Sequence, residues 1–131
     1  MTLTYRNGIG NQAAYMVSGV PFVTGSTLGA GGEDQISFPR VTKAVTVINT
    51  GAAAMRVHYN ASADGNVIGG GHFITLNPVG ATVPLSHFTF GTKCKEIYVS
   101  SVSGTTYEVF AELTTVATSE MYILTGSGLT D

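Results

Sequence analysis

The sequence contains few charged side chains. Only 11% of its 131 residues are Asp, Glu, Lys or Arg, whereas about 25% is typical of soluble domains. Much of the surface must therefore consist of uncharged polar and apolar groups, a composition that favours contact with other proteins. The six basic residues are spread along the chain and the net charge is -2, which argues against a nucleic-acid-binding protein with a basic stripe.

Cysteine, tryptophan and long apolar runs are also scarce. Cys94 is the only cysteine and there is no tryptophan, which excludes an intrachain disulfide and a cysteine-based metal cluster. The surrounding segment, KCKEIYV, predicts a buried thiol that behaves as a small hydrophobe. No run approaches the ~20 apolar residues of a membrane span, and the opening segment lacks the pattern of a secretory signal. We therefore expect a protein that is made in the cytoplasm and does not contact a membrane.

The residues that are abundant point to short strands. Seventeen glycines separate runs rich in Val, Ile, Thr, Tyr and Phe, which favour pleated, half-buried surfaces. Between residues 106 and 115, apolar side chains alternate with a face that carries Glu108 and Glu112, a period that predicts a strand rather than a helix. Strands at this spacing are typical of an antiparallel sandwich or barrel. The eight predicted strands are 35–40, 44–49, 54–60, 72–76, 81–86, 95–101, 106–115 and 120–125.

Composition divides the chain into three parts. Residues 1–34 are predicted to form an extended N-terminal arm that ends in a glycine-rich link, TGSTLGAGGED, because its glycines show no periodicity. Residues 35–125 form the sandwich, and residues 126–131 are a polar tail. The apolar segment AAYMVSGVPFV, within the arm, either docks on a neighbouring molecule or forms the first strand of the same sandwich. The sequence leaves both possibilities open.

Residues that support catalysis or metal binding do not gather in recognisable patterns. His58, His72 and His87 lack metal-ligand spacing, and His58 is expected on the solvated polar face of its strand. Glu33 and Asp34 lie in the glycine-rich link, where nothing is expected to perturb their pKa values. No nucleophile, base and orienting group can be assembled. We therefore expect no enzyme activity, no cofactor and no metal site.

Carbohydrate binding is the main alternative function. Sugar-binding sandwiches present aromatic platforms, often Trp, which this chain lacks. Tyr59, Tyr98 and Tyr107 could form a strip on one sheet. Core or interface tyrosines with a bonded hydroxyl are the more ordinary interpretation of such residues.

Four segments follow one another along the chain: ISFPRVTKAVTVINTGAAAMRVHYNA, GGGHFITL, KCKEIYVSSVSGTTYEVFAELTTV and the terminal LTGSG. Together they resemble small structural proteins of tailed bacteriophages. The resemblance covers residues 36–128 and lies in the general composition of the segments and their order along the chain. The proteins that it concerns are virion-associated and include β-sandwich decoration or cement proteins of the capsid. It implies a trimeric or dimeric protein that binds the major capsid protein or another virion protein, with a terminal arm as its gripping element. Whether it binds capsid, tail or fibre stays open.

We therefore expect an all-β antiparallel sandwich of jelly-roll type that serves as a capsid decoration protein on the virion surface. Few charges lower the cost of desolvating a contact face, and a symmetric oligomer multiplies weak attachments. The alternative is a glycan-binding module of a head or tail fibre. The residues expected to contact the partner are Tyr15, Met16, Val20, Pro21, Phe22, Met121, Tyr122 and Leu124.

Overall fold

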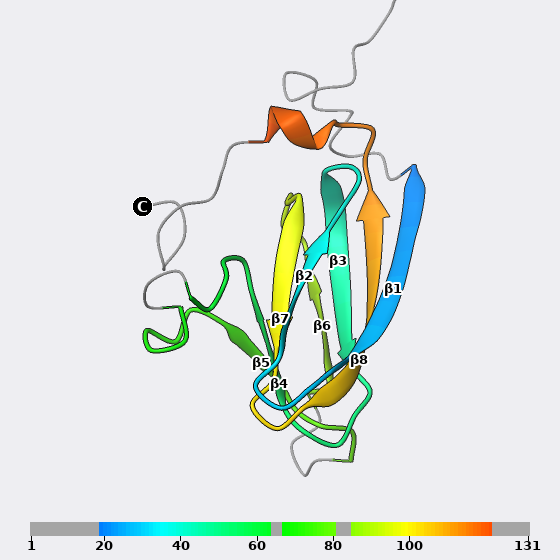
Figure 1. Ribbon diagram of the computed structural model, residues 1–131. Coiled ribbons are helices and arrows are strands. Elements are labelled where there is room, and N and C mark those ends of the chain that lie inside the picture. Colours follow the sequence, from blue (N-terminus) through cyan, green and yellow to red (C-terminus); the bar gives the residue numbers. More distant parts are fainter. Residues whose placement is uncertain (1–18, 64–66, 81–84, 122–131) are drawn as a thin grey trace, which may run out of the picture.

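The computed structural model describes residues 19–63, 67–80 and 85–121, which form an all-β sandwich (Figure 1). In this part of the chain, eight strands make two antiparallel sheets, in the orders β1-β8-β3-β6 and β2-β7-β4-β5. The strands are β1 (Val20–Leu28), β2 (Glu33–Ser37), β3 (Thr42–Asn49), β4 (Met55–His58), β5 (Ile74–Leu76), β6 (His87–Phe90), β7 (Glu96–Ser100) and β8 (Thr105–Leu113). A 3-10 turn, η1 (Thr118–Glu120), follows β8.

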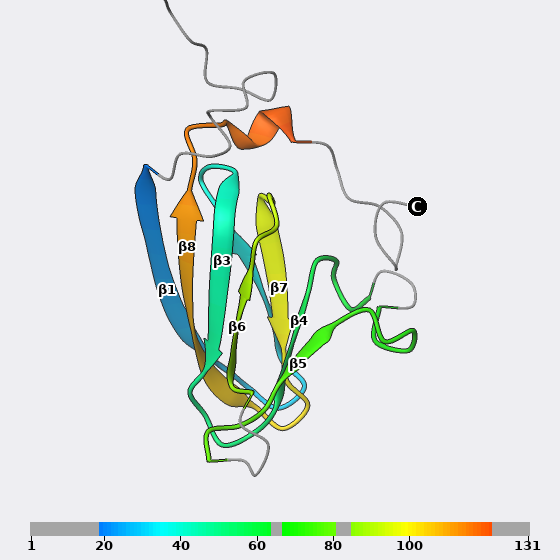
Figure 2. The same cartoon turned by 180° about the vertical axis from the view of Figure 1, so that it is seen from behind.

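The strand order is that of a jelly roll. β1 pairs with β8, β2 with β7, β3 with β6 and β4 with β5, so the chain is a long hairpin whose closed end lies between β4 and β5. The pairs β3·β8 and β4·β7 join these hairpin segments into two sheets. The sheets face each other, as the opposite views in Figures 1 and 2 show. The expected antiparallel sandwich of jelly-roll type is confirmed.

Alternating side chains fill the space between the sheets. On β8 the odd-numbered residues from Thr105 to Leu113 are buried, and the even-numbered residues face outward. Such a period of two removes one face of each strand from water, and complete burial of a Val, Leu or Ile side chain contributes about 1.5–3 kcal/mol. The core includes Val45, Val47, Met55, Val57, Leu76, Ile97, Val99, Val109 and Leu113, each at most 2% exposed.

β1 is the largest difference from the predicted organisation. It pairs along its whole length with β8, so this part of the predicted arm is a strand of the sandwich, the alternative that the sequence left open. Glu33 and Asp34, the end of the predicted link, begin β2. The sandwich therefore starts at residue 20 rather than at residue 35. Residues 1–18 and the predicted tail, 126–131, lie outside the described residues.

Two predicted strands also differ from the structure. Residues 81–84 of the predicted strand 81–86 lie outside the described residues, and Leu85 and Ser86 precede the observed strand β6. In β6, Phe88 and Phe90 lie opposite Val47 and Val45 of β3, and cross-strand packing of aromatic against β-branched side chains stabilises this pairing. In the predicted strand 120–125, Glu120 ends η1, and residues 122–125 lie outside the described residues.

A buried amide connects the two sheets at one end of the sandwich. Asn49, the last residue of β3, is 0% exposed. Its Nδ2 donates to the carbonyl oxygens of Ala53, at 2.8 Å, and Leu76, at 3.2 Å. Its Oδ1 accepts the backbone N–H of Gly51, at 3.1 Å, and the hydroxyl of Thr105, at 2.8 Å. A Cβ on Gly51 would lie 2.0 Å from Thr105 Oγ1, so this close approach requires glycine.

We expect Asn49→Ala to lower the free energy of unfolding by about 2–5 kcal/mol, because each buried group left without a partner costs about 1–3 kcal/mol. The substitution removes the donor for three backbone carbonyls. Asn49→Asp should cost more, since a carboxylate cannot donate to carbonyls and buries a charge. Urea denaturation followed by circular dichroism measures both, with the exposed Ser103→Ala as a control that should change stability by less than about 0.5 kcal/mol. An Asn49→Ala variant as stable as this control would contradict the assignment.

Candidate functional site

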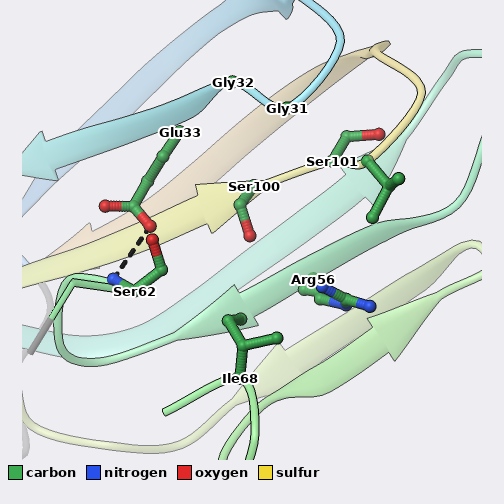
Figure 3. Close-up of a pocket in the computed structure, with 9 residues that line it drawn as sticks. Gly31, Gly32, Glu33, Arg56, Ser62, Ile68, Ser100 and Ser101 are labelled. Atoms are coloured by element: carbon green, nitrogen blue, oxygen red, sulfur yellow. Dashed lines mark hydrogen bonds between the residues drawn. The ribbon is translucent and has the colours of Figure 1, made fainter. Parts of the chain in front are cut away.

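A row of polar side chains crosses the outer face of the β2-β7-β4-β5 sheet. The register pairs Ser100 of β7 with Glu33 of β2 on one side and with Arg56 of β4 on the other. Directly opposite residues of neighbouring strands project from the same face of a sheet. Strand pairing therefore brings together three side chains from distant parts of the sequence, and Figure 3 shows Ser100 between the other two.

These three side chains line a hollow of about 170 Å³. Ser62 and Ile68, from the connection between β4 and β5, contribute to its wall, as do residues 31–32 before β2 and 101–102 after β7. The connection between β4 and β5 thus covers part of an otherwise open sheet face (Figure 3). The resulting hollow combines one acidic and one basic side chain with hydroxyl groups.

His58 of β4 lies beside the hollow and is 1% exposed. Its Nδ1 is 2.7 Å from the carbonyl oxygen of Asn60, and its Nε2 is 2.9 Å from Ser100 Oγ. A carbonyl oxygen can only accept, so Nδ1 carries the hydrogen of the first bond, and Nε2 forms the second bond with the Ser100 hydroxyl. The ring of Tyr98 stacks against this imidazole, with centroids 6.1 Å apart. The prediction of a solvated His58 is wrong, because the residues after β4 fold back over it.

Glu33 and Arg56 are not paired with each other. Glu33 Oε2 accepts the backbone N–H of Ser62 at 3.0 Å, as the dashed line in Figure 3 marks, and lies 3.8 Å from His58 Nε2. The Arg56 guanidinium packs over the ring of Phe73, 4.7 Å from its centroid. Among the described residues, no carboxylate forms an ion pair with this guanidinium. The hollow therefore offers a separate hydrogen-bond acceptor and a separate donor to a ligand.

The geometry suits hydrogen bonding to a ligand better than triad catalysis. In a Ser-His-acid triad the carboxylate holds the ring nitrogen that the serine does not use. Here Glu33 and Ser100 both face Nε2 of His58, and a backbone carbonyl occupies Nδ1. Within the described ranges, no group of three His, Cys, Asp or Glu side chains could hold a metal ion.

The residues predicted to contact a partner are divided between surface and interior. Val20 is 50% exposed and Pro21 is also exposed, at the start of β1. Phe22 turns inward, where its ring meets that of Phe38 edge-on at a centroid distance of 5.4 Å. Met121 packs against a small buried cluster beyond β8. The predicted contact residues outside the described part of the chain are Tyr15, Met16, Tyr122 and Leu124.

The three tyrosines considered for sugar binding do not form a strip. Tyr107 points into the core, and its hydroxyl donates to Asp34 Oδ2 at 2.7 Å. Tyr59 is partly buried against the core, and its hydroxyl donates to Thr92. Tyr98 lies on the outer face of its sheet. Tyr59 and Tyr107 therefore fit the preferred interpretation of tyrosines with a bonded hydroxyl, and the three residues do not form the shared aromatic platform considered as the alternative.

Sequence reasoning missed the row of Glu33, Ser100 and Arg56. Arg56 and Ser100 both occupy polar positions in alternating segments, which is a usable signal for one sheet face. The sequence does not reveal that β7 lies between β2 and β4. Glu33 gave no sign of lying on a strand, because the residues before it are mostly glycine.

Cys94 is 2% exposed, and its Sγ lies 3.3 Å from Thr42 Oγ1. Burial raises the pKa of this thiol, since the thiolate would lose its hydration. We expect the native thiol to react with an aromatic disulfide reagent at least about 100-fold more slowly than the urea-unfolded chain, because reaction requires opening of the fold. The chain has one cysteine, so absorbance reports this site alone. Equal rates in the two states would contradict a buried thiol.

We expect Tyr107→Phe to lower the free energy of unfolding by about 1–3 kcal/mol near neutral pH, because it leaves the partly buried Asp34 without its donor. Burial and then the Asp34 carboxylate raise the pKa of Tyr107. The unfolded state therefore loses its phenolic proton first, at a pKa of about 10, and the stabilisation declines as the pH rises above that value. Urea denaturation between about pH 7 and pH 11 should show the two proteins converging. A difference that is constant across this range would contradict the assignment.

A scan against models of protein families gives no match, and a search of curated proteins gives none. No helix in the described part of the chain is long and apolar enough to cross a membrane. Among solved structures, the chain is similar to a de novo designed double-stranded β-helix determined by NMR in solution, with a TM-score of 0.40 and 18% identity over 70% of this chain and 96% of that one.

Proposed function

We propose that this chain is a structural protein of a tailed-bacteriophage virion, which decorates the capsid and stabilises the shell through protein–protein contacts. It acts as a dimer or trimer at the capsid surface, and its partner is the major capsid protein or another virion protein. The resemblance of residues 36–128 to small virion proteins of tailed bacteriophages, among them decoration proteins, supports this function. A surface feature of the sandwich supports it independently.

This feature is an apolar pair on the outer face of the β1-β8-β3-β6 sheet. Val23 of β1 and Phe110 of β8 are cross-strand partners, and they are 71% and 42% exposed. Pro21 and Ile48 project from the same face according to the strand register. Exposed apolar groups that lie together favour a protein contact, in which an aromatic side chain supplies much of the binding energy.

Two carboxylates flank this pair. Glu108 and Glu112 flank Phe110 on β8 and face outward with it. On the other side, Thr46 and Thr89 satisfy each other through their hydroxyls, which are 2.9 Å apart. Carboxylates beside an apolar contact favour a partner that places Lys or Arg around an apolar pocket, because complementary charges orient docking. We therefore infer a basic-rimmed groove on the capsid partner.

The support behind this face is suited to repeated docking. Every buried side-chain nitrogen and oxygen in the described residues has a hydrogen-bond partner, and the core between the sheets is continuous. A contact surface on such a preorganised support loses little conformational entropy when it binds. A symmetric oligomer then adds the contributions of several weak contacts.

We expect Phe110→Asp to weaken binding to heads of the parent phage assembled without this protein by at least about 30-fold, because it removes an aromatic anchor and adds charge. The wild-type protein should raise the melting temperature of these heads, and the variant should not. Val79→Asp is the matched control, since Val79 is 62% exposed in a turn away from this face. Co-sedimentation and calorimetry measure the two effects, and circular dichroism confirms that both variants fold.

Wild-type protein that does not bind such heads would contradict the proposed function. Binding that Phe110→Asp and Val79→Asp reduce equally would instead contradict the choice of face. A glycan-binding module of a head or tail fibre is the second candidate. The polar hollow on the opposite sheet favours this candidate, whereas the tyrosines do not.

A further inference from the structure

We propose that the hollow over Ser100 binds a small neutral polyol, that is, one ring of a saccharide. This site lies on the outer face of the β2-β7-β4-β5 sheet, whereas the proposed capsid contact lies on the outer face of the other sheet. The inference rests on the second candidate function and is independent of capsid binding. Both faces can therefore be occupied at the same time.

The first argument is the separation of the two charges. β7 lies between β2 and β4, so the backbones that carry Glu33 and Arg56 are about 10 Å apart at ~4.8 Å per strand. Ser100 occupies the position between them. A ligand that lies over Ser100 can thus reach the carboxylate at one end and the guanidinium at the other.

The second argument is the sign of the charges. The carboxylate of Glu33 and the guanidinium of Arg56 carry opposite charges, and both ring nitrogens of the buried His58 are already within hydrogen-bond distance of Asn60 and Ser100. The charged pair consequently offers no net charge for selecting a simple anion or cation. Hydroxyl groups suit it better, because one hydroxyl can donate to Glu33 while another accepts from Arg56.

The third argument is the capacity of the Ser100 hydroxyl for a second hydrogen bond. It makes one hydrogen bond with His58 Nε2, and because a hydroxyl can both donate and accept, it keeps the capacity to bond a group in the hollow. Ser101, in contrast, is buried and already donates to the carbonyl of Ala54 and accepts from the N–H of Gly104. The ligand therefore meets a hydroxyl at Ser100, an acceptor at Glu33 and a donor at Arg56.

Size and lining set the expected affinity. The hollow of about 170 Å³ corresponds to about six water molecules at ~30 Å³ each, which is room for one sugar ring rather than for a chain. Ile68 and Val102 supply apolar contact for its C–H groups. Because ligand pockets usually measure about 300–1,000 Å³, we expect a Kd of about 1 mM for one site. Repetition of the site on a particle would raise the avidity.

A second hollow, of about 280 Å³, lies on the other side of His58. Its lining is mainly apolar, with Tyr59, Phe73 and Ile74, and no carboxylate, lysine or arginine contributes to it. Without convergent charged groups, this surface offers little to orient a polar ligand. The hollow over Ser100 is therefore the stronger candidate.

The test is a titration of the full chain, followed by two-dimensional 1H–15N NMR, with the methyl glycosides of glucose, galactose and mannose at up to about 50 mM. We expect saturable shifts for the amides of Gly32, Ser62 and Ser100 with at least one of them. Glu33→Gln and Arg56→Gln should each weaken the binding at least fivefold, in line with the loss of a charged hydrogen bond. Each spectrum also reports whether the variant is folded, and either variant alone suffices for the test.

Glu108→Gln and Arg40→Gln are the matched controls, because each makes the same chemical change at an exposed position away from the hollow. They should leave the affinity unchanged. Three results would overturn the inference. The first is that no glycoside produces saturable amide shifts, and the second is that the control variants lower the affinity as much as the site variants do. The third is that the free amino acid glycine, or inorganic phosphate, binds more tightly at the same residues. Capsid binding by Phe110→Asp is measured separately, so a failure of one proposal does not obscure the other.

Discussion

Directional hydrogen bonds fix how the two sheets lie on each other. Apolar packing between Val, Leu and Ile side chains is strong but non-directional, and by itself it would allow the sheets to slide. Asn49 prevents this at one end, because its amide binds backbone from β5 as well as the hydroxyl of Thr105 at the start of β8. The bond from Tyr107 to Asp34 joins the two sheets a second time, from β8 to β2. The arrangement of residues on both outer faces therefore depends on the relative position of the sheets that these bonds fix.

The two outer faces differ because the connections of the jelly roll lie unequally over them. The β1-β8-β3-β6 face leaves Val23 and Phe110 in water. On the opposite face, the connection between β4 and β5 folds back over the sheet, buries His58 and borders the hollow. One rigid support thus offers an apolar surface suited to another protein and a polar recess suited to a small ligand.

Alternation allowed much of the fold to be predicted, since the run from Tyr107 to Leu113 buries one face and exposes the other. β1 was harder to predict, because it is an edge strand in which Leu28 alone is fully buried and Phe22 and Thr24 are partly buried, and because its second half has the composition of a glycine-containing link. The 3-10 turn at Thr118–Glu120 has no sequence signal that separates it from a strand start.

The candidate site was less accessible to sequence reasoning than the fold. Arg56 and His58 have the same parity on one strand, yet one contacts an aromatic ring at the surface and the other is enclosed. The difference depends on where the chain turns after Tyr59, which local propensity does not determine. The row from Glu33 to Arg56 depends on pairing between strands that are far apart in sequence, and hydrophobic patterning does not encode partner choice.

The hairpin order of the strands has a consequence for synthesis. Among the strands of the described residues, β8 is the last to leave the ribosome, yet it is the neighbour of both β1 and β3. Until residue 113 has emerged, the nascent chain carries two unpaired strand edges, and such edges are templates for wrong pairing. The second half of β1 contains glycine, threonine and serine, so the side chains along one of these edges are only weakly apolar during that interval. The polar second half of β1, which the sequence placed in a glycine-rich link, thus also protects the unfinished polypeptide from self-association.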